Sequence, residues 1–334
     1  MVFSAAAAAA RMIMPALAVA AVAVSVSADP AFGPPPGIRL VDEANPLAGK
    51  PFYVDPISSA MRAAKGANNP QLTAIANTPA SYWLDQAFPS STVAGTVSRY
   101  AGAAQAAGAM PVLTLYAIPN RDCGSFAAGG FASGAEYRRW IDAVSTGLGG
   151  APAAIILEPD ALAMADCLSG DQRQERFDLM SYAVDKLTAN PAAAVYVDGG
   201  HSRWLAADDM AARLNSVGVA KARGFSLNTA NFYTTEEEIG YGETISGLTN
   251  GSHYVIDTSR NGVGPAPETP LNWCNPTGRA LGVAPTTDTA GAHADAYLWV
   301  KRPGESDGSC DRGEPWAGRF VNQYAIDLAQ NAGR

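Results

Sequence analysis

The sequence predicts an α/β fold in which parallel strands close into a barrel. Short apolar stretches alternate along the chain with longer stretches of helical character, which is the pattern of βα units and a parallel sheet. Ala153–Leu157 is apolar throughout, as expected of a strand that is buried on both faces. The number of alternations favours a closed barrel over an open, two-sided sheet, and a barrel carries its active site at the C-terminal ends of its strands.

The predicted elements follow one another from Asn45 to the end of the chain. Strands are predicted at Pro111–Ala117, Ala153–Leu157, Ala194–Asp198, Gly224–Asn228, Tyr254–Asp257 and Ala296–Lys301. Helices are predicted before, between and after them, at Val93–Ala107, Glu136–Leu148, Gln172–Thr188, Leu205–Asn215, Glu236–Leu248 and Trp316–Gln330. No glycine-rich phosphate loop follows any of these strands, so no nucleotide cofactor is predicted.

Residues 1–28 are predicted to be a signal peptide. Arg11 supplies the positive charge, Met12–Val26 is apolar, and small residues follow it. The apolar stretch is short for a membrane span, although the Ala-rich segment before Arg11 leaves a retained N-terminal anchor as the alternative. A Pro-rich linker is expected at residues 29–44 and a single folded domain at residues 45–334. We therefore expect a secreted protein whose mature form does not associate with a membrane.

Composition and charge exclude some classes of partner. The chain has 334 residues, of which 48% are hydrophobic and 16% are charged, as in an ordinary globular protein. The net charge is −8 and the sequence contains no Lys/Arg cluster. Nucleic acid is therefore not expected as a partner, because phosphate neutralisation requires a basic surface. A neutral polysaccharide is compatible with this balance, and a monomer is assumed.

The cysteines predict disulfides and not a metal site. Four are present, at Cys123, Cys167, Cys274 and Cys310. In an exported chain they are expected to form two disulfides, for which the sequence alone permits three pairings. A zinc site is the competing interpretation, but no pair has C-x-x-C spacing and the chain contains only three histidines. No metal or cofactor is predicted.

Each predicted strand ends in polar or ionisable residues. In strand order these are Tyr116, Arg121 and Asp122; Glu158 and Asp160; Asp198 and His201; Asn228 and Asn231; Asp257, Arg260 and Asn261; Lys301, Glu305 and Asp307. One such ending is common, but six in succession predict a ring-shaped site on the upper face of a barrel. Carboxylates dominate the set and metal ligands are scarce, which indicates proton transfer by acids. Glycoside hydrolysis is the chemistry that uses two carboxyl groups in this way.

Asp160 is the predicted general acid. The apolar strand before it and a nearby anion would both disfavour its charged form, and Asp122 is the candidate for that anion. For Asp122 the alternative is a structural ion pair with the adjacent Arg121. For Asp307, a second candidate carboxylate, the alternative is a solvated position in a glycine-rich turn.

Aromatic residues accompany the acids. Trp83, Trp204 and Trp273 lie among polar neighbours, where flat ring faces could stack on sugar rings, whereas Trp299 lies within an apolar strand and is assigned to the core. His201 is predicted to bind substrate by a hydrogen bond. A serine hydrolase built on His201-Ser202 is disfavoured, because the nucleophile elbow requires glycine where this chain has Trp204.

Together these motifs resemble glycoside hydrolase family 6, formerly cellulase family B. The matching stretches run in the family's order over nearly the whole chain after the linker: Asn45-Pro46, Phe52–Pro56, Tyr116–Cys123, Ile155–Leu162, Val197–Trp204, Val255–Gly262, Trp273–Gly282 and Leu298–Gly308. The resemblance implies a distorted barrel with fewer than eight strands. It also implies hydrolysis of β-1,4-glucan with inversion at the anomeric carbon.

The resemblance assigns roles to the site residues. Asp160 corresponds to the general acid, Asp122 to the neighbour that raises its pKa, and Asp307 to the base, which acts directly or through a chain of waters. Tyr116 corresponds to the residue that distorts the sugar ring at the cleaved bond. The implied charge network is Arg121, Asp198 and Arg260, and the implied substrate-binding residues are Trp83, His201, Trp204, Asn231, Trp273, Lys301 and Glu305. The disulfides implied by the family are Cys123–Cys167 and Cys274–Cys310.

The chain departs from the family at the loop that follows Asp122. Relatives use a serine in this loop to hold the catalytic water, and here Ser125 and backbone groups are the alternatives.

Two loops bear on the mode of action. In the family, enzymes that act from chain ends roof their cleft with two long loops, and enzymes that cut internally leave it open. Here both candidate roof loops, Asp166–Asp171 and Gly308–Gly313, are expected to pass almost at once into helices. We therefore expect an endo-acting enzyme with an open groove. The alternatives are a cellobiohydrolase and a catalytically silent β-glucan-binding protein, the latter disfavoured by retention of the three aspartates.

Overall fold

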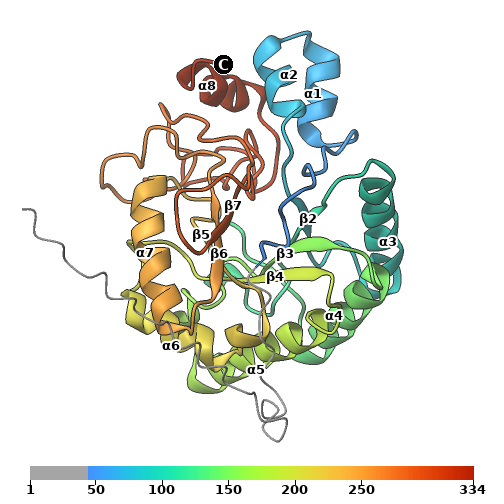
Figure 1. Ribbon diagram of the computed structural model, residues 1–334. Coiled ribbons are helices and arrows are strands. Elements are labelled where there is room, and N and C mark those ends of the chain that lie inside the picture. The colour runs from blue at the N-terminus through green and yellow to red at the C-terminus, as the bar shows by residue number, and fades with distance from the viewer. Residues whose placement is uncertain (1–43) are drawn as a thin grey trace, which may run out of the picture. The chain divides into compact units, whose positions relative to one another are not determined.

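A computed structural model describes residues 44–334 of the chain (Figure 1). The predicted signal peptide and nearly all of the predicted linker lie outside the described residues. Within residues 44–334, none of the helices combines the length and the hydrophobicity that crossing a membrane requires.

In residues 44–334, seven parallel strands form one sheet and pair in sequence order. They are β1 (Tyr82–Leu84), β2 (Val112–Leu115), β3 (Ala153–Leu157), β4 (Ala193–Asp198), β5 (Gly224–Leu227), β6 (His253–Asp257) and β7 (Ala294–Leu298). The register is continuous apart from one shift between Tyr254 and Val255. The six predicted strands correspond to β2 to β7. The sequence did not reveal β1, because three residues are too short to show a period.

The two edges of the sheet, β1 and β7, approach each other without forming a ladder in the described part of the chain. Two hydrogen bonds join them instead. The backbone N–H of Ser81 donates to the carbonyl oxygen of Trp299 (2.9 Å), and the indole N–H of Trp83 donates to the carbonyl oxygen of Val300 (2.8 Å). The sheet is therefore a distorted barrel with fewer than eight strands, as predicted.

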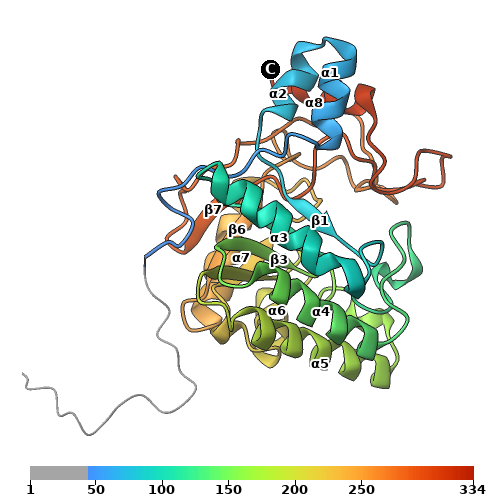
Figure 2. The ribbon, with the colours of Figure 1, turned by 90° about the vertical axis from the view of Figure 1, so that its right-hand side faces the viewer.

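The helices lie in two groups, of which one covers the outside of the curled sheet. They are α1 (Ser59–Ala67), α2 (Pro70–Ala76), α3 (Ser90–Ala106), α4 (Gly134–Leu148), α5 (Gly170–Leu187), α6 (Ala207–Ser216), α7 (Thr235–Leu248) and α8 (Asn322–Asn331). Each crossover from β1 to β6 contains one of the helices α3 to α7, whereas α1, α2 and α8 pack together elsewhere (Figures 1 and 2). Capping boxes begin α5, at Ser169 and Gln172, and α7, at Thr234 and Glu237.

The prediction of the last helix was wrong at its beginning. It was expected to start at Trp316, but α8 starts at Asn322. The backbone N–H of Gly318 donates to the carbonyl oxygen of Ser306 (2.8 Å), and Gly318 has a φ of 83°. Both features are incompatible with a helix at this point. Residues 308–321 are therefore a loop, longer than the sequence suggested.

Both faces of the sheet are buried, which explains the continuous apolar runs. Leu113, Ile155 and Val195 pack against the outer helices, while their neighbours Val112 and Ile156 fill the barrel interior. Trp299 is 1% exposed, which confirms its assignment to the core.

A polar cluster occupies the barrel at the N-terminal ends of its strands. The guanidinium of Arg223 forms two hydrogen bonds to the carboxylate of Asp295 (2.7 and 2.8 Å), and the hydroxyl of Tyr196 donates to the same carboxylate (2.7 Å). Asp295 and Arg223 are buried. The lower end of the barrel is thus filled by paired groups, and the opposite, C-terminal ends of the strands are left to form a site.

Candidate active site

A groove of about 590 Å³ lies at the C-terminal ends of the strands. Twelve predicted site residues line it: Trp83, Tyr116, Arg121, Asp122, Asp160, His201, Trp204, Asn231, Trp273, Lys301, Glu305 and Asp307. Asp198 and Arg260 are buried behind this lining, where Asp198 accepts a hydrogen bond from the backbone N–H of Asp160 and Arg260 donates to the carboxylate of Asp307. The structure therefore brings the predicted set together in one place.

The backbone turns sharply where the strands end at the groove. Asp122, Glu158 and Asp160 have φ values of 56°, 50° and 69°, and Asn228 and Ala230 after β5 have values of 64° and 60°. This left-handed region costs about 1–2 kcal/mol for each non-glycine residue. Such strain persists only where surrounding contacts impose it, and it clusters at functional sites.

Asp198 imposes the conformation of Asp160. The backbone N–H of Asp160 donates to Oδ1 of Asp198 (2.9 Å), which also accepts from the backbone N–H of Gly200 (3.0 Å). The hydroxyl of Ser226 donates to Oδ2 of Asp198 (3.0 Å). Burial raises the pKa of Asp198 to about 6, although these hydrogen bonds favour its charged form.

The carboxyl group of Asp160 has a strong affinity for its proton. Burial raises its pKa well above the ordinary value, and the negative charges of Asp198 and then Asp122 raise it further. A raised pKa was predicted from the sequence with Asp122 as the neighbouring anion. In the structure Asp198 has the larger effect, because it contacts the same residue directly. Asp160 has the proton affinity that a general acid requires.

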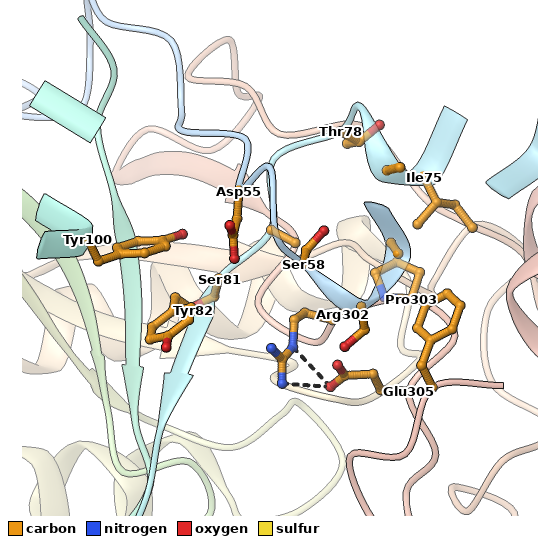
Figure 3. A pocket seen from close by; sticks show the side chains of 15 residues that line it. Asp55, Ser58, Ile75, Thr78, Ser81, Tyr82, Tyr100, Arg302, Pro303 and Glu305 are labelled. Carbon is orange, nitrogen blue, oxygen red and sulfur yellow. Dashed lines mark hydrogen bonds and ion pairs between the residues drawn. The ribbon is translucent and has the colours of Figure 1, made fainter. Parts of the chain in front are cut away.

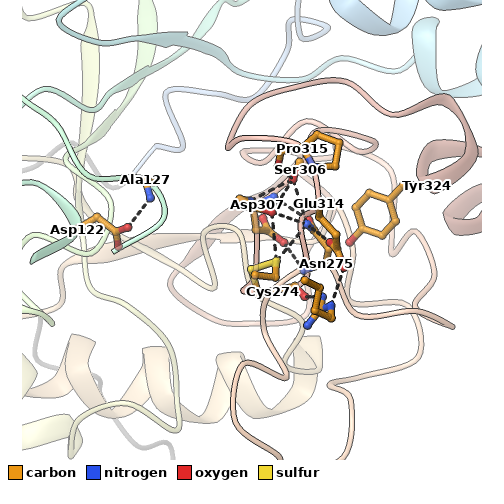
Figure 4. The surroundings of a disulfide bond; sticks show 12 residues. Asp122, Ala127, Cys274, Asn275, Ser306, Asp307, Glu314, Pro315 and Tyr324 are labelled. Atoms are coloured by element: carbon orange, nitrogen blue, oxygen red, sulfur yellow. Dashed lines mark hydrogen bonds and ion pairs between the residues drawn. A yellow bond between two sulfur atoms is a disulfide. The ribbon is translucent and has the colours of Figure 1, made fainter. Parts of the chain in front are cut away.

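Asp122 does not form the ion pair that was its structural alternative. Its carboxylate accepts a hydrogen bond from the backbone N–H of Ala127 (2.7 Å; Figure 4). Arg121 turns elsewhere: its guanidinium donates to the carbonyl oxygen of Tyr116 (2.7 Å) and lies 4.4 Å from the centre of the Tyr116 ring. Burial raises the pKa of Asp122, against the opposing effects of the Ala127 N–H and Arg121.

Asp307 is buried and paired, so the alternative of a solvated turn is wrong. Its Oδ2 accepts from Arg260 (2.8 Å) and from the backbone N–H of Asn275 (3.0 Å), and its Oδ1 lies 2.9 Å from Nζ of Lys301. Burial opposes its charge, but Arg260 and Lys301 outweigh burial and lower the pKa of Asp307. This carboxylate therefore stays ionised where Asp160 holds a proton.

Asn275 holds the Asp307 loop in place by hydrogen bonds, a role that the sequence did not reveal. Its side-chain oxygen accepts from the backbone N–H of Asp307 (2.7 Å), which makes the contact between the two residues reciprocal (Figure 4). Its side-chain amide contacts the carbonyl oxygen of Gly308 (3.0 Å). The neighbouring disulfide Cys274–Cys310 joins the same two segments.

The disulfide pairing implied by the family is confirmed. Cys123 is bonded to Cys167 and Cys274 to Cys310, with Cα–Cα distances of 6.3 and 5.7 Å. The first bond joins the loop after β2 to the loop after β3, next to Asp122. Among residues 44–334 no group of three or more acidic, histidine or cysteine side chains is arranged to hold a metal ion.

His201 is held as a neutral hydrogen-bond donor. Its ring stacks on Tyr233, with centres 4.3 Å apart, and lies 5.1 Å from Trp204. Nδ1 accepts from the backbone N–H of Arg203 (3.3 Å), which leaves Nε2 to carry the proton. Burial, and then the charge of Arg203, lower the pKa of His201 to about 4. The side chain can therefore donate to an uncharged oxygen in the groove.

Glu305 offers an acceptor beneath the groove. Its Oε2 pairs with the guanidinium of Arg302 (2.9 Å), beside a small cavity of about 30 Å³ that Asp55 and Tyr82 help to line (Figure 3). Its buried Oε1 has no hydrogen-bond partner among the described residues.

Three aromatic side chains line the groove without having been predicted: Phe126, Tyr233 and Trp316. Phe126 packs against Trp273, with ring centres 6.0 Å apart. Trp316 was misplaced in the last helix, although Gly318 within the predicted segment is a residue that disfavours a helix interior.

Comparison with known proteins identifies the family. The model of glycosyl hydrolases family 6 matches residues 43–332. The chain belongs to glycosyl hydrolase family 6. The solved structure of the endoglucanase Cel6 from Mycobacterium tuberculosis, in complex with methyl-cellobiosyl-4-deoxy-4-thio-β-D-cellobioside, superposes with a TM-score of 0.87. It is 79% identical in sequence, and the match covers 87% of this chain and 100% of that one.

Two relatives carry different names within this family. Endoglucanase A from Cellulomonas fimi is 46% identical over 284 residues, which are 84% of this chain. The chain spans 61% of the length of that protein. The probable 1,4-beta-D-glucan cellobiohydrolase C from Aspergillus terreus is 31% identical over 364 residues, with 88% of this chain and 77% of the relative covered.

The raised pKa of Asp160 predicts how stability depends on pH. Between the pKa of Asp160 in the unfolded chain and its higher value in the folded protein, the folded state binds more protons, so the free energy of unfolding falls as the pH rises. Asp160→Asn removes this loss. We expect the stability of the variant relative to the parent to increase from pH 3 to pH 8 in urea unfolding.

The exposed carboxyl of Asp288 provides a matched control for this experiment. Asp288→Asn measures the effect of removing one exposed carboxylate. An Asp160→Asn difference whose change with pH matches that of Asp288→Asn would contradict the raised pKa of Asp160.

Proposed function

We propose that the chain is a secreted endo-β-1,4-glucanase that hydrolyses internal bonds of cellulose or a related β-glucan with inversion at the anomeric carbon. One observation carries the proposal: Asp160, with its pKa raised well above the ordinary value, lies in a groove lined by aromatic rings. A protonated carboxyl group at this place can give its proton to the departing glycosidic oxygen. The endoglucanase names of the Cellulomonas fimi and Mycobacterium tuberculosis proteins support the substrate.

Inversion requires a water on the opposite face of the sugar from the acid, and a second carboxylate that stays ionised. Asp307 meets the second condition, because Arg260 and Lys301 lower its pKa. The same pairing makes Asp307 a weak base. We therefore infer that the attacking water passes its proton along waters of the open groove to bulk solvent, which later returns a proton to Asp160, with Asp307 supplying a negative charge close to the cationic sugar.

Tyr116 and Asp122 act on the sugar at the cleaved bond in this proposal. The Tyr116 ring is fixed between the Arg121 guanidinium and the edge of Trp83, whose ring centre is 5.3 Å away. A rigid ring at this position can favour a distorted sugar over the relaxed chair. Asp122 adds a negative charge near Asp160, which keeps the acid protonated and favours the cationic transition state. Ser125 also lines the groove, within reach of a water-holding role.

The open groove supports internal cleavage. The first candidate roof loop is short, because a 3₁₀ turn at Ala165–Cys167 passes into α5 at Gly170. The second loop, residues 308–321, is longer than predicted. The rim residues Trp273 and Trp316 are nevertheless 37% and 68% exposed, so this loop does not cover them.

Secretion is supported by the two disulfides. Such bonds persist in oxidising compartments outside the cytosol and are rare within it. A secreted enzyme would also meet its polymeric substrate directly.

Asp160→Asn is expected to lower kcat on soluble cellulose by about 10²–10⁴-fold, the usual contribution of a general acid. Affinity for cello-oligosaccharides, measured by calorimetry, is expected to change little, because the proton acts in the transition state. Asp288→Asn serves as the matched control and should retain the parental kcat. Parental activity of Asp160→Asn would refute the assignment of the acid.

The stereochemistry of the products tests inversion. Proton NMR of a fresh digest of cellohexaose is expected to show the α-anomer of the new reducing end first, with the β-anomer growing in by mutarotation. The early appearance of the β-anomer would indicate a retaining mechanism with a covalent intermediate.

The mode of cleavage is tested with carboxymethyl cellulose. An endo-acting enzyme is expected to lower the viscosity much faster than it releases reducing ends, because each internal cut shortens the chain greatly. Steady release of cellobiose without loss of viscosity would favour a cellobiohydrolase, and binding without any release would favour a silent glucan-binding protein.

A further inference from the structure

We propose that Trp316 forms a further sugar-binding platform at the rim of the groove, for a glucose unit beyond those held by the predicted substrate-binding residues. The proposal rests on the proposed function, because it concerns the same β-1,4-glucan. Trp316 lines the groove and is 68% exposed. Among the exposed large hydrophobic side chains of residues 44–334, the two aromatic ones are Trp273 and Trp316, and both lie at this groove.

The backbone that carries Trp316 is fixed. A tight turn runs from Trp316 to Arg319, in which the backbone N–H of Arg319 donates to the carbonyl oxygen of Trp316 (3.1 Å) and Gly318 has a φ of 83°. A positive φ at the third residue of a turn is a conformation that glycine adopts without strain. The exposed ring is thus attached to a defined turn.

Buried Ser306 holds this turn against the site. Its hydroxyl donates to the carbonyl oxygen of Pro315 (2.7 Å), its backbone N–H donates to the carbonyl oxygen of Arg319 (2.9 Å), and its carbonyl oxygen accepts from Gly318 (2.8 Å). Ser306 lies between Glu305 and Asp307 in the chain. The position of Trp316 is therefore tied directly to residues of the groove.

One face of the indole ring is already occupied. The guanidinium carbon of Arg319 lies 5.1 Å from the ring centre, which restrains the orientation of the ring. A restrained flat ring with a free face binds a sugar ring at a low cost in side-chain entropy. A neutral glucan is the occupant that matches this surface, because the groove continues from Trp316 to Glu305 and to the neutral donor His201.

Chain length provides the test. The value of kcat/KM is measured on cellotetraose and cellohexaose for the parent, Trp316→Ala and Trp316→Phe. Trp316→Ala is expected to lower kcat/KM on cellohexaose about fivefold more than on cellotetraose, the range of one aromatic contact. Trp316→Phe should recover most of this difference. Calorimetric titration of cellohexaose into Asp160→Asn, with and without Trp316→Ala, measures the corresponding loss of affinity without turnover.

Leu248→Ala is the matched control, since Leu248 is an exposed hydrophobic residue at the end of α7, away from the groove. It should leave both substrates unaffected. If Trp316→Ala lowers kcat/KM equally on the two substrates, or lowers it on neither, the platform is overturned and the proposed function stays intact. A parent protein that hydrolyses neither oligosaccharide would overturn both.

Discussion

The hydrogen bond from the backbone N–H of Asp160 to the carboxylate of Asp198 serves the site in two ways, because it fixes a backbone conformation and brings two carboxyl groups together. The first effect holds Asp160 at a φ of 69°, where its side chain lines the groove. The second adds the negative charge of Asp198 to the burial that already raises the pKa of Asp160. Asp198 is itself held by Gly200 and Ser226. A neutral acceptor at Asp198 could keep the backbone in place, but it would lose the electrostatic effect on the acid.

The surroundings of two aspartates in the same groove shift their pKa values in opposite directions. Around Asp160 the charges of Asp198 and Asp122 come before the opposing charge of Lys301, whereas Asp307 is paired with Arg260 and Lys301. Environments that separate two pKa values in this way define one acid and one anion. The loop that carries Asp307 is also held in place from its other side, by Asn275 and by the Cys274–Cys310 disulfide. The charge distribution of the site is therefore built into the loops that carry these residues.

The sequence predicted most of the fold and of the groove, for a physical reason. Strands buried on both faces must be apolar over their whole length, so Ala153–Leu157 could be recognised, whereas β1 has three residues and shows no pattern. Strand ends share one edge of a parallel sheet, which gathered twelve predicted residues in the groove. Contacts between distant segments were not predictable. The resemblance placed Asp198 in the charge network, but not its hydrogen bond to the backbone of Asp160. That bond, the hydrogen bonds between Asn275 and the Asp307 loop, and the position of Trp316 beside Ser306 all depend on such contacts.

The buried acids also link catalysis to the stability of the fold. Burial raises the pKa of Glu158 and of Glu238 to about 7, and that of Asp198 to about 6. Each of these groups contributes stability that is present at low pH and is lost as the pH rises through its folded pKa. Asp307 behaves in the opposite sense, because its pKa is lowered in the folded protein. Its contribution to stability is present at pH values above the pKa of Asp307 in the unfolded chain and is lost as the pH falls through its folded pKa. The raised and the lowered pKa values thus act on the free energy of unfolding in opposite directions. Asp160 belongs to the first group, so the rise in pH that removes the proton of the acid also weakens the fold.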